Sequence, residues 1–95
     1  MQAAVLAGPA DMRTETAPVP APGLGEIRFR LEGCGVCASN VEPFEGQPWS
    51  TFPSEPGSMG HEGWGVIDAV GEGVTGFAVG VRVAALSGKS FAQYD

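Results

Sequence analysis

The sequence has few basic residues. Lysine and arginine together number 5 against 11 aspartates and glutamates, which gives a formal net charge of −6. No basic patch is available to contact phosphate groups, so we expect neither nucleic acid nor an anionic membrane surface among its partners. The sequence also lacks a charged leader followed by an apolar run, and it has no apolar stretch long enough to span a bilayer. These absences predict a soluble, cytoplasmic protein.

Cysteine is scarce as well, with 2 thiols in 95 residues. That is too few for the disulfide framework of a small secreted domain, and in a reducing compartment such a pair more often binds a metal or takes part in catalysis. A chain of this length forms at most one small domain, whose core is marginal unless a metal, a partner or more polypeptide helps to close it. The composition agrees with part of an intracellular enzyme.

Alternating and β-branched patterns predict a mostly β structure. From Glu26 to Glu32 polar and apolar residues alternate, with Ile27, Phe29 and Leu31 on one face, which is typical of a half-buried strand. Glycine and proline turns separate the further strands that we predict, which are residues 2–6, 64–70, 81–86 and 90–94.

A single short helix is predicted directly after the cysteines. Ser39 followed by Glu42 matches a capping box, and Pro43 and Gly46 keep the helix short. We find no pattern for a helix of ordinary length. The expected fold class is therefore mostly β, a small barrel or sandwich with one short helix.

Three aromatic residues lie in or after a predicted loop at residues 47–58. Trp49 and Phe52 belong to this proline- and glycine-rich loop, and Trp64 follows it. Two interpretations stay open: the aromatic rings line an apolar substrate pocket, or they pack together and hold the loop in place.

Two glycine-rich segments contain the side chains with the clearest chemistry. Cys37 ends the segment Gly-Cys-Gly-Val-Cys, residues 33–37, and His61, the only histidine, lies in Gly-His-Glu, residues 60–62. Thiolate and neutral imidazole are ligands that zinc prefers, and a catalytic zinc takes three protein ligands and keeps one position open. Cys37 and His61 are therefore candidate metal ligands, and they form only part of such a set.

Other interpretations of these residues remain possible. Cys34 and Cys37 form a C-x-x-C pair, which also occurs in redox sites and in structural zinc knuckles. Cys34 alone is most simply a buried apolar residue. If these residues have no part in metal binding or catalysis, His61 is a hydrogen-bonded core histidine, Glu62 is a solvated surface charge, and Ser39 is only a helix cap.

The longest motif is Gly-His-Glu-Gly-Trp-Gly at residues 60–65, followed by Gly71 and Val74. It resembles the N-terminal GroES-like domain of the zinc-dependent alcohol dehydrogenases, in the medium-chain dehydrogenase/reductase superfamily. Further matches to that family are Ala3-Ala4-Val5, the connector from Pro18 to Gly25, Gly-Val-Cys-x-Ser at residues 35–39, and Gly80-x-Arg82-Val83. The resemblance implies that residues 1–95 are the N-terminal part of a GroES-like catalytic domain, a partial β-barrel, and that the cofactor-binding Rossmann domain lies outside the chain.

The same resemblance implies a function and a set of roles. It implies hydride transfer between an alcohol or polyol and NAD(P), with Zn2+ held by Cys37 and His61. Glu62 then corresponds to a carboxylate beside the metal, and Ser39 to the hydroxyl that relays the proton of the substrate. We expect a homo-oligomer at full length, and weak zinc binding without turnover in the isolated chain. The alternative is a non-enzymatic GroES-like module that binds a metal or a protein partner.

The chain departs from the family pattern at several positions. Asn40 stands where the family commonly has aspartate, and we expect its amide oxygen to accept a hydrogen bond from the His61 ring. Glu42 replaces a histidine at the outer end of the proton relay, and Ala38 replaces an arginine near the cofactor. No four-cysteine lobe follows Leu86, so a second zinc site is not expected.

Overall fold

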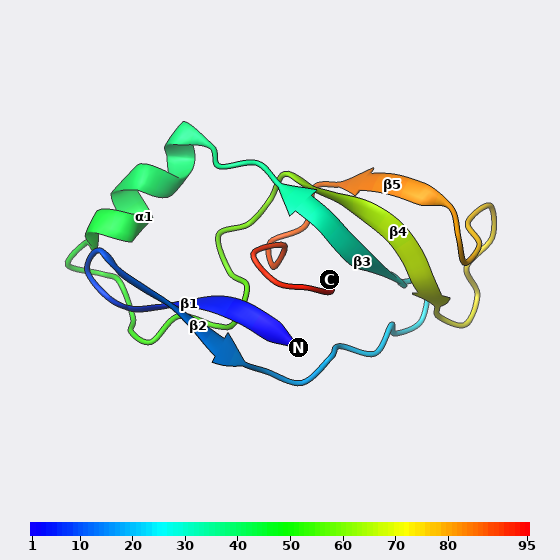
Figure 1. The fold of residues 1–95 in the computed structure, drawn as a ribbon, viewed down its shortest axis with the longest axis horizontal. Helices are drawn as coiled ribbons and strands as arrows, with labels where there is room; N and C mark the ends of the chain where they lie inside the picture. Colours follow the sequence, from blue (N-terminus) through cyan, green and yellow to red (C-terminus); the bar gives the residue numbers. More distant parts are fainter.

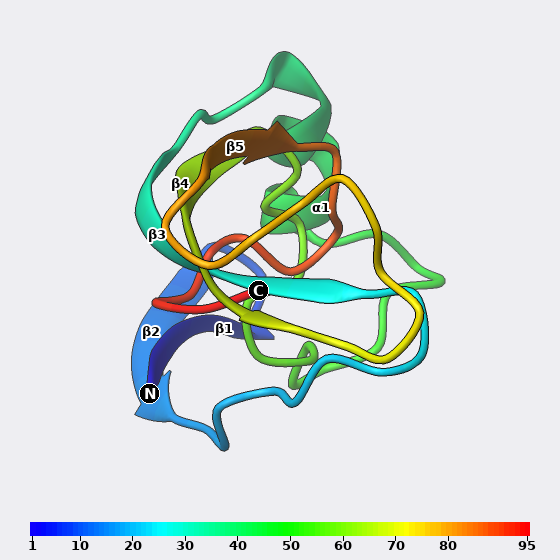
Figure 2. The same cartoon turned by 90° about the vertical axis from the view of Figure 1, so that its right-hand side faces the viewer.

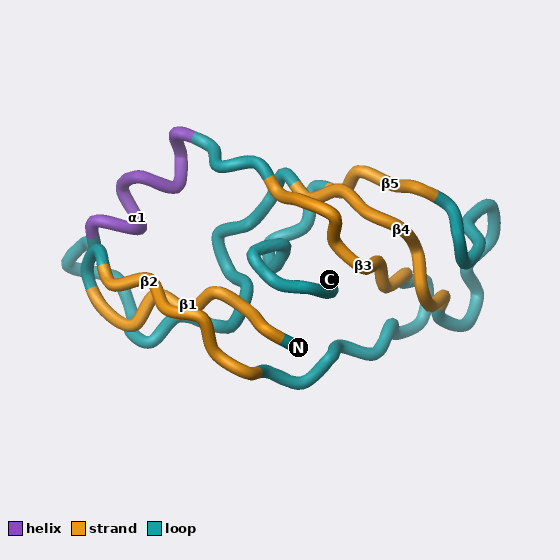
Figure 3. Tube along the Cα trace, in the orientation of Figure 1, coloured by secondary structure: helices purple, strands orange, loops and turns teal.

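The strands form two antiparallel sheets (Figures 1 and 3). The computed structural model describes all 95 residues. One sheet pairs β1 (Gln2–Gly8) with β2 (Asp11–Thr16), and the other has the order β3 (Ile27–Cys34), β4 (Gly63–Val70), β5 (Arg82–Ala85). The helical residues are a 3-10 turn η1 (Ala38–Asn40) and α1 (Val41–Glu45). Strands predominate and there is one short α-helix, which confirms the predicted, mostly β fold class. The two sheets do not close into a barrel, in agreement with the predicted partial barrel.

The three-stranded sheet contains the main buried pair and leads into both glycine-rich segments. Phe29 on β3 lies opposite Ile67 on β4, and the two residues are 3% and 1% exposed. Beside them, Arg28 forms a two-point ion pair with Asp68, at 2.9 and 3.0 Å. The strand predicted for residues 26–32 is therefore confirmed, and it continues to Cys34.

Two glycines, one in β4 and one directly after it, let main chains approach closely. A Cβ atom at Gly65 would fall on the carbonyl oxygen of Arg30 in the neighbouring strand. A Cβ atom at Gly71 would fall on the carbonyl oxygen of Gly23 in the connector before β3. Any larger residue at these two positions would have to displace backbone, so Gly65 and Gly71 are needed for the close approach of the main chains.

Strand β2 was not predicted from the sequence. Its residues are mostly exposed, and it is held by regular pairing with β1 from Gln2 opposite Thr16 to Leu6 opposite Met12. A tight turn at Pro9 and Ala10 joins the two strands. An edge strand with polar side chains on both faces shows no alternation, because only its main chain is specified by pairing.

Residues 90–95 do not form the strand predicted at 90–94. They lie between the β1–β2 hairpin and β3 (Figures 1 and 2), where Ala92 bridges to Ala3 and Tyr94 bridges to Arg30. The segment pairs alternately with two different sheets, so no run of consecutive pairs forms on either side.

The helical stretch η1–α1 lies beside the tip of the hairpin (Figure 3), where the Ala10 N–H donates to the Phe44 carbonyl at 2.7 Å. Gly46, with φ of 83°, caps its end, as the sequence predicted. No helix of the structure combines the length and the apolar character that crossing a membrane requires.

Candidate metal centre

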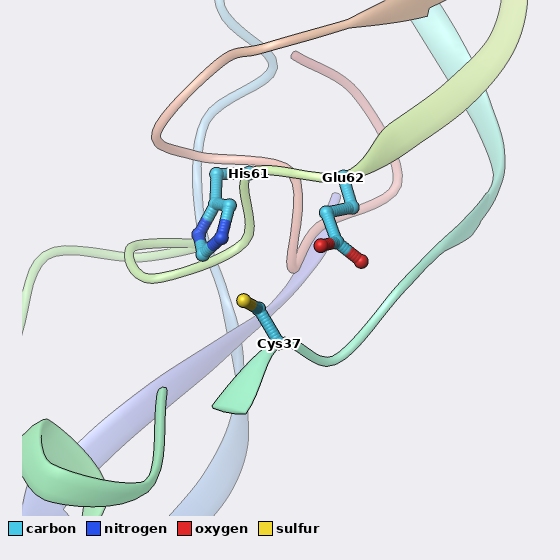
Figure 4. A group of neighbouring side chains, drawn as sticks. All are labelled: Cys37, His61 and Glu62. Carbon is cyan, nitrogen blue, oxygen red and sulfur yellow. The ribbon is translucent and has the colours of Figure 1, made fainter. Parts of the chain in front are cut away.

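The pairing of β3 with β4 brings the two glycine-rich segments together. Cys34, at the end of β3, lies opposite Gly63, at the start of β4. Cys37 follows Cys34 along the chain, and His61 and Glu62 come directly before Gly63. Their side chains turn toward a common space (Figure 4), and the possible ligand atoms of all three lie within 4.8 Å of one another.

The ring of His61 is oriented by a main-chain carbonyl. Its Nδ1 lies 2.9 Å from the carbonyl oxygen of Met59, which can only accept, so Nδ1 carries the proton in this hydrogen bond. The lone pair of Nε2 is then free on the side that faces Ser39, whose Oγ is 3.5 Å away. This tautomer presents Nε2 as the ligand atom for a metal.

The thiol of Cys37 lies in surroundings that favour its charged form. The pKa of Cys37 is lowered, first by a hydrogen bond from the Ser39 hydroxyl and then by the Ser39 main chain and His61, against the opposing effects of burial and the Glu62 charge. The pKa of His61 is raised, first by its hydrogen bond to Cys37 and next by the Met59 carbonyl. A metal ion that binds here needs the thiolate and the neutral ring, so protons compete with it at His61.

The capping box predicted from Ser39 and Glu42 is wrong. The chain first makes the 3-10 turn η1, and the cap moves back to Cys37, whose N–H donates to Oδ1 of Asn40 at 3.0 Å. Ser39 is thereby free of a capping role and faces His61. Glu42 lies exposed in the first turn of α1.

The expected hydrogen bond from His61 to Asn40 is also wrong. Asn40 uses its Oδ1 for the Cys37 N–H and donates from Nδ2 to the Met59 carbonyl at 2.8 Å. The His61 ring bonds to the same carbonyl instead of to the amide. Met59 therefore belongs to the site through its main chain, and no side-chain pattern in the sequence indicates such an acceptor.

Glu62 and Cys34 differ in their relation to the cluster. The carboxylate of Glu62 lies against Gly35, whose missing side chain leaves room for it, and it belongs to the cluster of three. Cys34 is half-buried, its Sγ is 3.4 Å from the Gly35 carbonyl, and it does not belong to that cluster.

An apolar cavity of about 640 Å³ is lined by residues that neighbour the cluster in the sequence, among them Val36, Asn40 and Met59. None of the three aromatic residues considered for a pocket lines it. Trp49 is 75% exposed and is not packed in its loop, which corrects that expectation, while Trp64 covers Gly33. The cavity is instead lined by residues of β1, β2, α1 and the segment around Phe91.

Comparison with known proteins identifies the family of the chain. The model of the alcohol dehydrogenase GroES-like domain matches residues 23–94. An alcohol dehydrogenase from Moraxella sp. (strain TAE123) is 44% identical over 72 residues, which are 76% of this chain and 21% of that protein. Sorbitol dehydrogenase from Homo sapiens is 37% identical over 81 residues, which are 84% of this chain and 23% of that protein.

Solved structures agree with these matches. The crystal structure of an NAD-dependent alcohol dehydrogenase is 36% identical, with a TM-score of 0.75 over 88% of this chain and 25% of its own. The present chain spans about a fifth of the length of the curated relatives that it matches. Because the family model covers more than half of the sequence and the fold agrees with it, the chain belongs to the alcohol dehydrogenase GroES-like domain family.

Proposed function

We propose that the chain is the metal-binding N-terminal portion of the catalytic domain of a zinc-dependent NAD(P) alcohol or polyol dehydrogenase. The observation that carries the proposal is the cluster of Cys37, His61 and Glu62, whose ligand atoms lie within 4.8 Å of one another. Relatives named as alcohol and sorbitol dehydrogenases support the substrate class. A similar structure described as NAD-dependent, and another complexed with NADH, support a nicotinamide cofactor held outside this chain.

The donor set fits zinc. Sulfur and nitrogen are its preferred ligand atoms, a carboxylate oxygen is an accepted third one, and the lowered pKa of Cys37 favours the thiolate that a metal needs. Cys37 and His61 would hold the ion, with Glu62 beside it. When bound, zinc supplies a Lewis acid for the substrate hydroxyl, and the nicotinamide ring supplies the hydride acceptor.

Ser39 is placed to move a proton. Its Oγ lies 3.5 Å from Nε2 of His61, and the side chain is exposed to solvent. In the proposed reaction this Oγ accepts the proton that leaves the substrate hydroxyl and passes it to water. Glu62 contributes a negative charge at the same place, which favours a bound dication.

The metal site is tested by titrating Co2+ into the chain and following the absorption that a thiolate–cobalt bond produces. We expect the wild-type chain and Cys34→Ser to develop this band, Cys37→Ser to lose it, and His61→Ala to bind more weakly. Loss of the band in Cys34→Ser with its retention in Cys37→Ser, or no binding by the wild type, would contradict the proposal.

Turnover separates the enzyme portion from a non-enzymatic module. The isolated chain offers a thiol, an imidazole and a carboxylate but no nucleotide-binding unit, so we expect no alcohol-dependent reduction of NAD(P) by it. Measurable reduction by the chain alone would contradict this expectation. If a longer form of the protein bound zinc and still showed no turnover with alcohols or polyols, the non-enzymatic alternative would be favoured.

A further inference from the structure

Ser90 is a buried residue that contacts the main chain on both sides of His61 and Glu62. Its exposed fraction is only 2%. Its N–H donates to the carbonyl of Gly60, directly before His61, at 3.0 Å. A Cβ atom at Gly63 would fall on Oγ and Cβ of Ser90, so the Ser90 side chain lies against the main chain directly after Glu62. Ser90 therefore holds both ends of the segment that contains two members of the cluster.

The hydroxyl of Ser90 is bound to a carboxylate whose main chain is fixed to β3. Ser90 Oγ donates to Oδ2 of Asp95 at 2.6 Å, in a partly buried contact. The N–H of Asp95 donates to the Phe29 carbonyl at 3.1 Å, and its carbonyl accepts from the Phe29 N–H at 2.8 Å. Because β3 leads into Cys37, the hydrogen bond between Ser90 and Asp95 connects the segment of His61 with the strand that precedes Cys37.

Few other contacts hold this part of the chain in a fixed register. Residues 90–95 form two isolated bridges, at Ala92 and Tyr94, and no continuous ladder. A side-chain hydrogen bond across such a segment contributes a larger share of its order than it would in a regular strand. Hydrogen bonds from a hydroxyl to a carboxylate are also among the stronger ones in proteins.

We propose that Ser90 and Asp95 form a positioning pair for the metal centre. Their hydrogen bond sets the place of the segment containing His61 and Glu62 relative to β3. Neither side chain belongs to the cluster of three possible ligands, so both act through the main chains that they hold. This inference rests on the proposed function, because it concerns the geometry of the proposed ligands.

An asparagine at position 95 separates positioning from simple electrostatics. Asp95→Asn removes the negative charge, but its amide can still form a hydrogen bond with Ser90 Oγ. If the charge of Asp95 alone favoured a bound dication, Asp95→Asn and Asp95→Ala would weaken binding equally and Ser90→Ala would not. Positioning predicts instead that Ser90→Ala and Asp95→Ala weaken binding, while Asp95→Asn does not.

The test is a titration of Co2+ alone into five forms of the 95-residue chain: wild type, Ser90→Ala, Asp95→Ala, Asp95→Asn and Glu55→Gln. Glu55→Gln is the matched control, because it removes the same charge from the exposed ion pair with Lys89, the neighbour of Ser90. We expect Ser90→Ala and Asp95→Ala to bind Co2+ about 3- to 10-fold more weakly, the effect of losing one hydrogen bond. Asp95→Asn and the control should bind as the wild type does. Unchanged binding by Ser90→Ala, or weakened binding by Asp95→Asn, would overturn the proposal.

A second readout needs no metal and distinguishes a local effect from a general loss of stability. In the metal-free chain, the amide of residue 90 exchanges its proton when its bond to the Gly60 carbonyl opens, whereas the Ile67 amide, bonded to Val81, reports on the sheet. After correction for intrinsic rates, we expect exchange at residue 90 to be about 3- to 10-fold faster in Ser90→Ala and Asp95→Ala, with a smaller change at Ile67.

Three results would overturn the proposal by this readout: no acceleration at residue 90, equal acceleration at residue 90 and Ile67, or unfolding of both alanine variants by circular dichroism. The last two would show a role in stability alone. If the wild type bound no Co2+, the proposed function would fail, while proton exchange would still test the pair of Ser90 and Asp95.

Discussion

Replacing Ile67 with alanine tests whether the sheet that supports the centre is packed as described. Ile67 is 1% exposed and lies opposite Phe29, which is 3% exposed. Its main chain is held by two hydrogen bonds to the segment before β5, since its N–H donates to the Val81 carbonyl at 2.9 Å and its carbonyl accepts from the Gly80 N–H at 2.8 Å. The strand therefore cannot shift easily to refill the space that the side chain leaves.

The expected loss follows from the atoms removed. The substitution deletes three buried carbon atoms, and at about 0.8 kcal/mol each the transfer cost is roughly 2.4 kcal/mol. The cavity that remains adds to this cost, and such substitutions lower the free energy of unfolding by about 2–5 kcal/mol. The smaller change Ile67→Val should lower it by about 0.5–1.5 kcal/mol. Domains of this size have a free energy of unfolding of roughly 5–14 kcal/mol. The alanine variant therefore loses a large part of its stability.

Urea unfolding followed by circular dichroism measures this loss. Val70→Ala is a suitable control, because Val70 lies at the end of the same strand and is 41% exposed. We expect the order of stability to be wild type, Val70→Ala, Ile67→Val and then Ile67→Ala. If Ile67→Ala cost no more than Val70→Ala, the side chain would not be enclosed in solution, and the packing argument for β3 and β4 would be refuted.

Two further predictions concern the backbone and the thiol. Gly65→Ala should lower the melting temperature sharply, because the new Cβ would fall on the Arg30 carbonyl, whereas Gly88→Ala, with nothing within 4 Å of its Cβ, should not; equal melting temperatures would contradict the close approach. Ser39→Ala should raise the pKa of Cys37, because the Ser39 hydroxyl is the main cause of its lowering. The midpoint of the pH–rate profile for alkylation should then move upward, measured on a background without the other thiol, and an unchanged midpoint would rule out this cause.

The sequence predicted those parts of the fold in which side chains carry the pattern. Apolar and polar residues alternate over positions 26–32 because Phe29 is buried while its neighbour Arg30 is exposed. The strand could therefore be predicted from the sequence. Strand β2 was not visible, since its side chains are mostly exposed and pairing with β1 alone defines it. The bridges of residues 92 and 94 depend on two sheets being near each other, which no local pattern records.

The same division holds at the centre. Cys37 and His61 were found from their residue types and glycine frames, and the structure brings both into one cluster with Glu62. The contacts that orient them were not found, because the acceptor for His61 is the main-chain carbonyl of Met59. Every residue has such a carbonyl, so only the folded chain shows which one points at the ring.

The segment around residues 91–95 hydrogen-bonds to the free side of β1, and it joins positions far apart along the chain. The N–H of Gln2 donates to Oε1 of Gln93, 91 positions later, at 2.8 Å. Closing so long a loop reduces the entropy of the chain before the contact contributes any favourable free energy. This order of events slows folding. During synthesis β1 emerges first, and one of its edges stays unpaired until residues 91–93 have been made. Until then a nascent chain is exposed to pairing with its neighbours through this edge.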